Sequence, residues 1–322
     1  MKGPALIGKN LSLGYTQGKI RKEVLSGLNF SLNSGELTCL LGPNGVGKST
    51  LVKSIMGRLE PWRGEILLNG KRIEDYPREE LAREMAVVLT EPVLPAQMTV
   101  YQLVGLGRAP YTDWMGSLNN QDEEAVEEAL SNTKIQYLRD QRLGEISDGQ
   151  RQKALIARAL AQDCDVVILD EPTAHLDLVN RYEVMYLLRE IAQKEKKAIL
   201  VVTHDLDIAL ETADRFWLMN CGTPLISGRP EDLVFSGEIN ELIAGGQFHF
   251  SMKRGRVEFQ HPQAELEIEG PGDMVYWVQK ALNKAGVKQI ASPIRLVKDP
   301  FSIFYDGTSF DSLDDLIRFL LK

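Results

Sequence analysis

Two hydrophobic patterns divide the first two thirds of the chain. Over residues 1–35, apolar and polar positions alternate between turn residues, as in LSLGY at 11–15 and LNFSLNSGE at 28–36. Alternation with a period of two predicts short antiparallel strands. From residue 37 to about 219, short apolar runs alternate with longer amphipathic stretches. This second pattern predicts strands that are buried on both faces and joined by helices, which together form a mostly parallel α/β sheet.

The predicted elements of this sheet are short. Helices are expected over 122–130 and 150–161, among others. No window of 18 apolar residues occurs, and the start MKGPALIGKN lacks an apolar signal-peptide core. The chain is therefore expected not to span a membrane itself and to remain in the cytosol. The apolar runs are LTCLLG at 37–42, MAVVLT at 85–90, DVVILD at 165–170 and AILVVT at 198–203.

A boundary is predicted between Gly245 and Gly255, which separates a first domain, 1–245, from a small α+β domain, 251–322. Strands are expected at 256–259 and 264–269, and a hairpin at 301–310 whose Asp306-Gly307 pair suits a type I′ turn. One helix should run from about Met274 to Ala285 with Asp273 as its cap. The last helix has an apolar face made by Leu313, Leu316, Ile317 and Leu320.

Composition and charge restrict the function classes. The chain of 322 residues is 43% hydrophobic and 25% charged, with a net charge of −8. This is an ordinary globular composition that argues against a nucleic-acid binder. Residues 251–322 carry equal numbers of acidic and basic side chains, which argues against a basic membrane-binding tail. Cys39, Cys164 and Cys221 are too far apart for a metal or disulfide framework, and Cys39 is expected in the core.

The segment GPNGVGKST carries the strongest chemical signal, because it lies between a predicted strand and a predicted helix. Its glycines let backbone N–H groups turn toward a phosphate, and the next helix adds its positive N-terminal end. Lys48 places a charge near the β- and γ-phosphates, and Ser49 offers a hydroxyl to Mg²⁺. The predicted phosphate-binding residues are Gly42, Pro43, Asn44, Gly45, Val46, Gly47, Lys48, Ser49 and Thr50.

Three further segments supply carboxylates, a helix end and a histidine. In VVILDEPTAHLD, a buried strand ends at Asp170 and Glu171, which suit Mg²⁺ binding and activation of water, respectively. EISDGQRQK predicts a capped helix whose N-terminus could bind an anion. VVTHD ends a strand at His204, where a γ-phosphate contact is expected, although such a histidine is more often structural.

Taken in order, these segments resemble the ATP-binding subunits of ABC transporters over roughly residues 5–235. The resemblance implies a P-loop NTPase fold of the ABC ATPase type, with N-terminal antiparallel strands and a helical subdomain at about 92–162. It also implies ATP and Mg²⁺ as cofactors. It assigns Gly42–Thr50 to Walker A, Ser147–Gln152 to the signature, Val166–Glu171 to Walker B, Ala174–Asp177 to the D-loop, His204 to the switch histidine and Tyr15 to the aromatic residue that stacks on adenine.

The resemblance further implies a head-to-tail dimer that sandwiches each ATP between the Walker A of one copy and the signature of the other. Ser147 and Gly149 would then serve the partner's nucleotide, and Gln150 and Asp177 are also expected to bind nucleotide. Hydrolysis would drive a polytopic membrane permease, placing the chain on the cytoplasmic face of the membrane, with an external substrate-binding protein as an indirect partner.

Two positions depart from the family pattern. The signature reads ISDGQ in place of LSGGQ, so Asp148 adds a negative charge that is tolerable only if its side chain points away from the phosphates. The Q-loop glutamine is replaced by Glu91, whose carboxylate could reach Mg²⁺ or the attacking water. Gln97, six residues further on, is the rival candidate.

Several segments resemble in sequence the subfamily that imports iron–siderophore complexes, haem and cobalamin, among them LGRAPY, SDGQRQK, IARALAQD and PTAHLDLVNR. Iron(III)-siderophore import is favoured; haem or cobalamin import remains an alternative. In this family the stretch 99–116 helps form the surface that receives the permease. The competing view for this chain is that Leu103, Val104 and Leu106 are core and Arg108 is a solvated charge.

Two other classes stay open. One is a permease-free ABC ATPase, such as an iron–sulfur assembly factor, and the other is a nucleotide-sensing scaffold without activity. A single nucleotide domain argues against the first, and the intact Lys48, Asp170, Glu171 and His204 argue against the second. The domain at 251–322 is either regulatory or dimerising, or a stabilising appendage.

Overall fold

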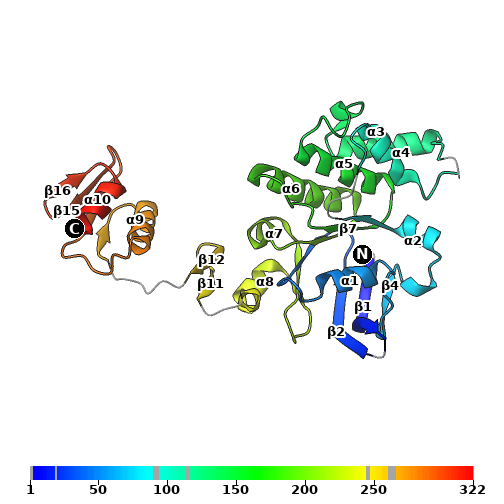
Figure 1. Ribbon diagram of the computed structural model, residues 1–322, viewed down its shortest axis with the longest axis horizontal. Helices are drawn as coiled ribbons and strands as arrows, with labels where there is room; N and C mark the ends of the chain where they lie inside the picture. Colours follow the sequence, from blue (N-terminus) through cyan, green and yellow to red (C-terminus); the bar gives the residue numbers. More distant parts are fainter. Residues whose placement is uncertain are drawn as a thin grey trace. The chain divides into compact units, whose positions relative to one another are not determined.

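The computed structural model describes residues 3–18, 20–89, 94–113, 116–243, 247–259 and 266–321. These residues form two compact units. The first is Met1–Ala244 with Phe250–Val257, and the second is Gly245–His249 with Glu258–Lys322. Figure 1 labels the elements of both units. No helix in the described part of the chain is long and apolar enough to cross a membrane.

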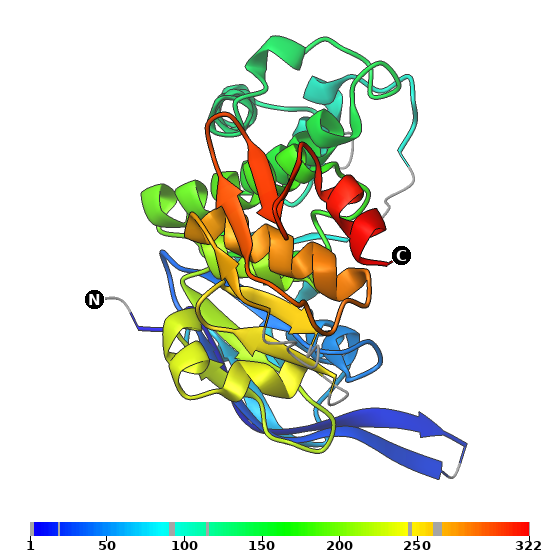
Figure 2. The same ribbon diagram turned by 90° about the vertical axis from the view of Figure 1, so that its left-hand side faces the viewer.

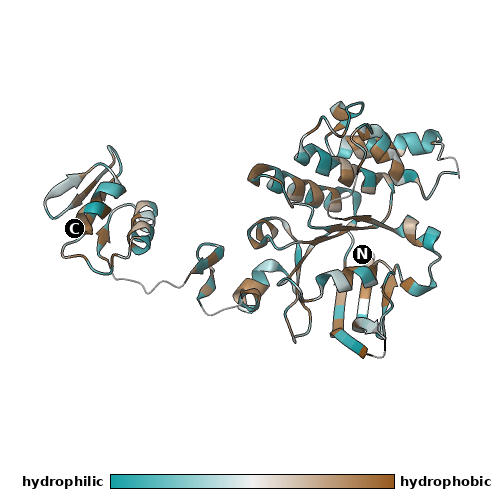
Figure 3. Cartoon of the chain, in the orientation of Figure 1, coloured by the Kyte–Doolittle hydropathy of each residue, from teal (hydrophilic) through white to brown (hydrophobic). Residues whose placement is uncertain are grey.

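A six-stranded sheet in the order β10-β9-β3-β8-β7-β6 forms the centre of the first unit. Neighbouring strands are parallel except for β9 and β10. The four apolar runs of the sequence supply β3, β6, β7 and β8, which confirms the predicted α/β sheet, and these strands are hydrophobic in Figure 3. The strands are β3 (Leu37–Leu41), β6 (Met85–Val88), β7 (Val166–Asp170), β8 (Ala198–Val202), β9 (Arg215–Leu218) and β10 (Ile226–Gly228).

Side chains alternate between the two faces of this sheet and feed two separate hydrophobic clusters. In β7, Val167 and Leu169 enter one cluster, and Val166 and Ile168 enter the other. Cys39 is buried on the first of these faces, as the sequence predicts, and burial raises the pKa of its thiol. The first face is covered by α3 (Val100–Gly105), α4 (Asn120–Asn132), α5 (Asp148–Ala161), α6 (Leu178–Glu195), α7 (Leu206–Thr212) and α8 (Pro230–Phe235).

The other face is covered by α1 (Lys48–Ile55) and by the N-terminal antiparallel sheet. The order of that sheet is β2-β1-β4-β5. Its long β1–β2 hairpin continues past the pairing with β4 and extends away from the body of the unit in Figure 2. The strands are β1 (Leu6–Gln17), β2 (Ile20–Leu32), β4 (Arg63–Leu68) and β5 (Lys71–Arg72), followed by α2 (Arg78–Glu84).

The two helices predicted at 122–130 and 150–161 are α4, which is two residues longer at each end, and α5, which is two residues longer at its N-terminus. Asn119 caps α4 and Ser147 caps α5, and both caps are capping boxes that satisfy backbone N–H groups at the helix start. Short 3₁₀ turns complete the unit at Ile73–Asp75, Leu106–Arg108, Gln136–Leu138 and Glu238–Leu242.

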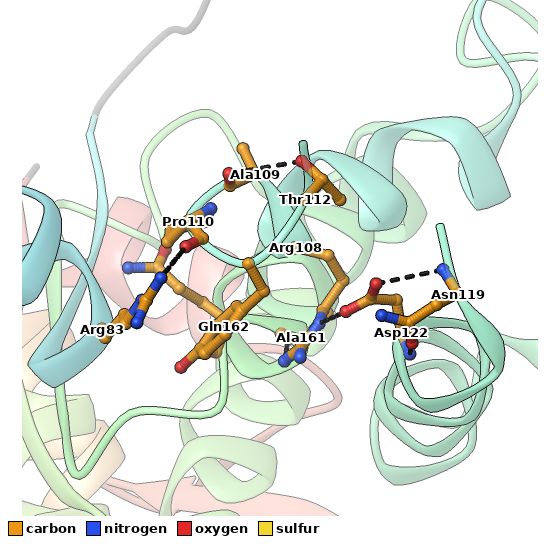
Figure 4. A network of polar contacts seen from close by, with 10 residues as sticks. Arg83, Arg108, Ala109, Pro110, Thr112, Asn119, Asp122, Ala161 and Gln162 are labelled. Atoms are coloured by element: carbon orange, nitrogen blue, oxygen red, sulfur yellow. Dashed lines mark hydrogen bonds and ion pairs between the residues drawn. The ribbon is translucent and has the colours of Figure 1, made fainter. Parts of the chain in front are cut away.

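A buried polar network fixes the turn that follows α3 (Figure 4). The expectation that Arg108 is a solvated charge is wrong, because Arg108 is buried and donates to Asp122 Oδ1 at 2.8 Å and to the Ala161 carbonyl. Its guanidinium also lies 4.0 Å from the ring centroid of Tyr111. Leu103 and Val104 are core as expected, whereas Leu106 is 52% exposed. The segment LGRAPY at 106–111 therefore contains structural residues together with one exposed leucine.

The second unit is a small α+β fold with its own hydrophobic cluster. Its sheet has the order β13-β14-β15-β16, in which β13 and β14 are parallel and the later pairs antiparallel. Asp306 and Gly307 both have positive φ angles and join β15 to β16, as the sequence predicts. The elements are β13 (Ile268–Glu269), β14 (Ile294–Val297), β15 (Ser302–Tyr305), β16 (Thr308–Phe310), α9 (Gly272–Lys284) and α10 (Leu313–Leu320).

One predicted cap in this unit is wrong. Pro271, and not Asp273, is the N-cap residue of α9, and its side chain makes no capping bond. Asp273 lies in the first turn, where its negative charge still interacts favourably with the helix dipole.

The strand predicted at 256–259 is β12 (Arg256–Phe259), which pairs with β11 (Phe248–Ser251). Of the strand predicted at 264–269, only Ile268 and Glu269 are paired, and 260–265 lie outside the described residues.

Candidate active site

A glycine-rich loop connects β3 to α1 at the side of the central sheet formed by the carboxyl ends of its parallel strands. Lys48 Nζ folds back over this loop and donates to the carbonyl of Gly42 at 2.6 Å and to that of Pro43 at 3.2 Å. Gly47 has a φ angle of 114°, and a Cβ atom there would lie 2.8 Å from the Leu25 side chain. Only glycine fits this position, because both the backbone conformation and the space exclude a side chain. The loop is thereby shaped to direct N–H groups and a lysine toward one anion.

The loop borders a cavity of about 860 Å³. Ser49 and Thr50 line it from α1, Asp170 and Glu171 line it from the end of β7, and Tyr15 lines it from β1. The Tyr15 hydroxyl lies 3.3 Å from Thr50 Oγ1. The predicted residues that line this cavity are Tyr15, Asn44, Gly45, Val46, Gly47, Lys48, Ser49, Thr50, Asp170 and Glu171.

Burial and charge perturb the ionisable groups of the cavity. Burial lowers the pKa of the Lys48 ammonium, while the negative Glu171 and Asp170 oppose this shift. Burial also raises the pKa of the Asp170 carboxyl, and the neighbouring Glu171 raises it further. A divalent cation beside Asp170 would stabilise its ionised form. The hydroxyl of Ser49 and this carboxylate are hard oxygen donors, so the residues present fit Mg²⁺.

Glu171 and His204 come together because β7 and β8 are adjacent parallel strands that end at the same edge of the sheet. His204 Nδ1 lies 2.9 Å from Glu171 Oε2 and 3.0 Å from Oε1. Glu171 has a φ angle of 50°, and its backbone N–H donates to the Val202 carbonyl. This unusual backbone, held by the neighbouring strand, directs the carboxylate to the cavity wall.

The predicted signature and D-loop residues occupy a different place. Ser147 accepts a hydrogen bond from the Gln150 N–H, and the Gln150 side chain accepts one from the Ser147 N–H. Asp177 caps α6 by accepting from the backbone and side chain of Asn180, and these bonds lower the pKa of its carboxyl. Within the described ranges, none of Ser147, Gly149, Gln150 and Asp177 lines the 860 Å³ cavity.

The charge of Asp148 is balanced within its own helix. Its carboxylate lies 3.2 Å from the Arg151 guanidinium, one turn further along α5. Glu91 lies outside the described residues, so its predicted role in binding Mg²⁺ or water stays a prediction. Gln97 is exposed and borders neither this cavity nor the hollow of about 250 Å³ that adjoins Asp148, Arg151 and Glu171.

Comparison with known proteins agrees with this geometry. Residues 25–174 match the model of the ABC transporter family. An uncharacterized ABC transporter ATP-binding protein of Methanocaldococcus jannaschii is 44% identical over 253 residues, which cover 79% of this chain and 86% of the relative. The chain belongs to the ABC transporter ATP-binding proteins. It is an ATPase that uses ATP with Mg²⁺, as the phosphate loop and the paired carboxylates predict.

Two further ABC proteins are similar to this ABC ATPase. A probable siderophore transport system ATP-binding protein of Bacillus subtilis is 40% identical over 230 residues, covering 71% of this chain and 82% of the relative. A solved dimeric structure of a bacterial ABC transporter cassette matches with a TM-score of 0.59 at 25% identity, covering 70% of this chain and 98% of the other. The predicted ABC ATPase fold is thereby confirmed.

Several cavity residues of this ABC ATPase had no signal in the sequence. Lys22–Ser26 line the cavity from β2, and Asn220–Pro224 line it from the turn after β9. The β9 turn reaches the cavity because β9 pairs beside β3, so both strands end next to the phosphate loop. Strand adjacency of this kind has no local signal in the sequence. Asn180, which does not line the cavity, also had no signal in the sequence; its side chain would be 2.5 Å from a Cβ atom at Gly149.

Proposed function

We propose that this ABC ATPase energises the import of iron(III)-siderophore complexes through a membrane permease. The observation that carries the substrate class is the 40% identity to the probable siderophore transport ATP-binding protein. Support for hydrolysis comes from the contact between Glu171 and His204 at the cavity that holds the phosphate loop. The chain would act at the cytoplasmic face of the membrane, with an external substrate-binding protein delivering the complex to the permease.

In the proposed reaction, water attacks the γ-phosphorus of ATP and ADP leaves. Glu171 orients and polarises this water, and His204 holds the Glu171 carboxylate and contacts the γ-phosphate. Lys48, the loop N–H groups and the N-terminus of α1 stabilise the charge on the phosphate oxygens. Ser49 and Asp170 would hold Mg²⁺, which neutralises the phosphates when bound. Tyr15 would stack on adenine.

We also propose that two copies of the chain form the active unit. Ser147, Gly149, Gln150 and Asp177 do not border the cavity of their own chain. They lie where two helices begin, and Ser147 and Gly149 at the start of α5 offer an anion site to a partner. A head-to-tail dimer would bring this helix end to the nucleotide of the other copy, and the similar cassette is solved as a dimer.

The experiment is detergent purification of the full chain from its native membranes, as wild type and as Glu171→Gln with ATP bound. We expect a polytopic permease to co-purify and to be identified by mass spectrometry. Absence of any membrane protein in both preparations would favour the permease-free ATPase. The recovered complex, reconstituted with its binding protein, should show ATPase activity stimulated by iron(III)-siderophore. Stimulation by haem or cobalamin alone would overturn the substrate class.

A further inference from the structure

The end of the β1–β2 hairpin that carries Tyr15 has weak strand support. β1 pairs with β4 from Leu6↔Leu68 to Ser12↔Arg63, and beyond Ser12 its only strand partner in the described part of the chain is β2. Tyr15 therefore lies in a two-stranded ribbon, where it is opposite Lys22. Two-stranded ribbons are marginally stable without further packing. Something else has to hold this ribbon if the position of the Tyr15 ring matters.

Trp62 occupies the place where a third strand would continue. Its backbone N–H donates to the Ser12 carbonyl at 2.8 Å, directly before β4 begins. Its indole packs against β1 at Gly14, where a Cβ atom would be 2.3 Å from the Lys22 carbonyl oxygen of β2, 2.6 Å from Trp62 Cη2 and 2.9 Å from Cζ3. The glycine thus permits the close approach of both the β2 backbone and the indole.

Arg21 holds the indole from the other strand of the ribbon. Its guanidinium lies 4.8 Å from the Trp62 ring, and its residue pairs with Thr16 in the hairpin. A cation over an indole face is a favourable contact of about 0.5–1 kcal/mol at an exposed site. Trp62 therefore contacts both strands of the ribbon, at Gly14 on β1 and at Arg21 on β2.

Trp62 and the Tyr15 ring lie on opposite faces of the ribbon. Arg21, which contacts Trp62, is next to Lys22, the residue opposite Tyr15. Successive side chains of a strand point to opposite faces, so the Tyr15 side chain faces away from Trp62. Tyr15 lines the nucleotide cavity and reaches Thr50, whereas Trp62 is not among the described residues that line it. Trp62 can thus influence the nucleotide only through the ribbon that it supports.

We propose that Trp62 is the positioning residue for Tyr15. By packing against the face of the ribbon opposite Tyr15, it keeps the Tyr15 ring in the orientation that binds adenine. The inference rests on the proposed adenine contact of Tyr15. The phosphate loop is built on β3 and α1, which are not part of the ribbon. Trp62 should therefore set affinity for the adenosine part of the nucleotide and leave binding of the phosphates unchanged.

The test compares binding of ATP and of inorganic tripolyphosphate to the full chain by calorimetry, together with KM and kcat. If Trp62→Ala leaves about one tenth of the molecules with Tyr15 in place, the Kd and KM for ATP rise about tenfold. The Kd for tripolyphosphate and kcat at saturating ATP should stay at the wild-type values. Trp62→Phe should restore most of the ATP affinity, and the matched control Trp277→Ala, at an exposed position of the second unit, should change nothing.

A double-mutant cycle separates this inference from the function on which it rests. In a Tyr15→Ala background, Trp62→Ala should weaken ATP binding no further, since Trp62 acts through Tyr15. An equal loss in both backgrounds, or an equal loss for tripolyphosphate, would overturn the proposal for Trp62. Unchanged ATP affinity in Tyr15→Ala alone would instead refute the adenine contact. Should Trp62→Ala not fold, Arg21→Ala removes only the cation and predicts a smaller shift in the same direction.

Discussion

The Arg108 guanidinium donates to the Asp122 carboxylate at 2.8 Å inside the helical part of the first unit, and both residues are buried. Arg108 comes from the turn after α3 and Asp122 from the first turn of α4, where it also accepts from the Asn119 N–H. Figure 4 shows Arg108 between Asp122 and the Ala161 end of α5. Arg108 thus fastens the turn after α3 to two other helices, to α4 through the ion pair and to α5 through the Ala161 carbonyl.

Removing one partner of this pair should cost much of the stability of the unit. In Arg108→Ala the Asp122 carboxylate stays buried without its cation, and the free energy of unfolding should fall by about 3–5 kcal/mol. Urea unfolding followed by circular dichroism measures the loss. The control is Lys134→Ala, which breaks an exposed pair with Glu190 and should cost less than about 1 kcal/mol. Equal losses in the two variants would show that the buried pair contributes no more than an exposed one.

The same pair predicts a pH dependence of stability. Desolvation raises the pKa of Asp122, but the hydrogen bonds from the Asn119 N–H and from Arg108 outweigh it and leave the pKa below its usual value. A depressed pKa stabilises the folded protein above the unfolded value, about 3.9, and this contribution disappears as the pH falls through the folded value. The stability difference between wild type and Asp122→Asn, measured from pH 3 to pH 7, should therefore be large at neutral pH and shrink in acid. A difference independent of pH would contradict the assignment.

The Asp148–Arg151 pair predicts the behaviour of the unusual signature. Arg151 neutralises Asp148 at the start of α5, so Asp148→Gly should leave ATPase activity within about twofold of wild type, since an exposed pair contributes little. Arg151→Ala leaves the carboxylate uncompensated near the proposed phosphate site of the partner and should slow hydrolysis. The double variant Arg151→Ala/Asp148→Gly should recover the lost rate. Steady-state assays measure the ATPase rates of the three variants. If Asp148→Gly does not restore the rate lost in Arg151→Ala, the role of Arg151 is not to neutralise Asp148.

The sequence predicted those parts of the site that follow from local order. Asp170, Glu171 and His204 each follow an apolar run, and the parallel sheet brings these strand ends together. Residues that are placed by strand pairing had no such signal. Asn220 lines the cavity because β9 pairs with β3, and Trp62 supports the Tyr15 ribbon because β4 pairs with β1. Burial of a charge was equally hidden, because no carboxylate is near Arg108 in the apolar segment after it, 109–111, and its partner Asp122 lies on another helix.

The hairpin of β11 and β12 predicts where the chain can be shortened. Phe250 is 7% exposed and packs in the large cluster of the first unit, and its N–H donates to the Asn240 side chain. A chain that ends at residue 259 keeps these contacts and should bind ATP with the affinity of the full chain. Calorimetry of ATP binding tests this. Loss of ATP binding in the folded 1–259 chain would show that the second unit contributes to the nucleotide site.

The buried Phe250 ring also predicts a stability effect. Phe250→Ala in the full chain should lower the free energy of unfolding of the first unit by about 3 kcal/mol, because the ring leaves a cavity behind. The matched control is Phe304→Ala, an exposed position in the second unit, which should leave the stability of the first unit unchanged. Thermal unfolding measures both variants, and equal stability of Phe250→Ala and wild type would contradict this prediction.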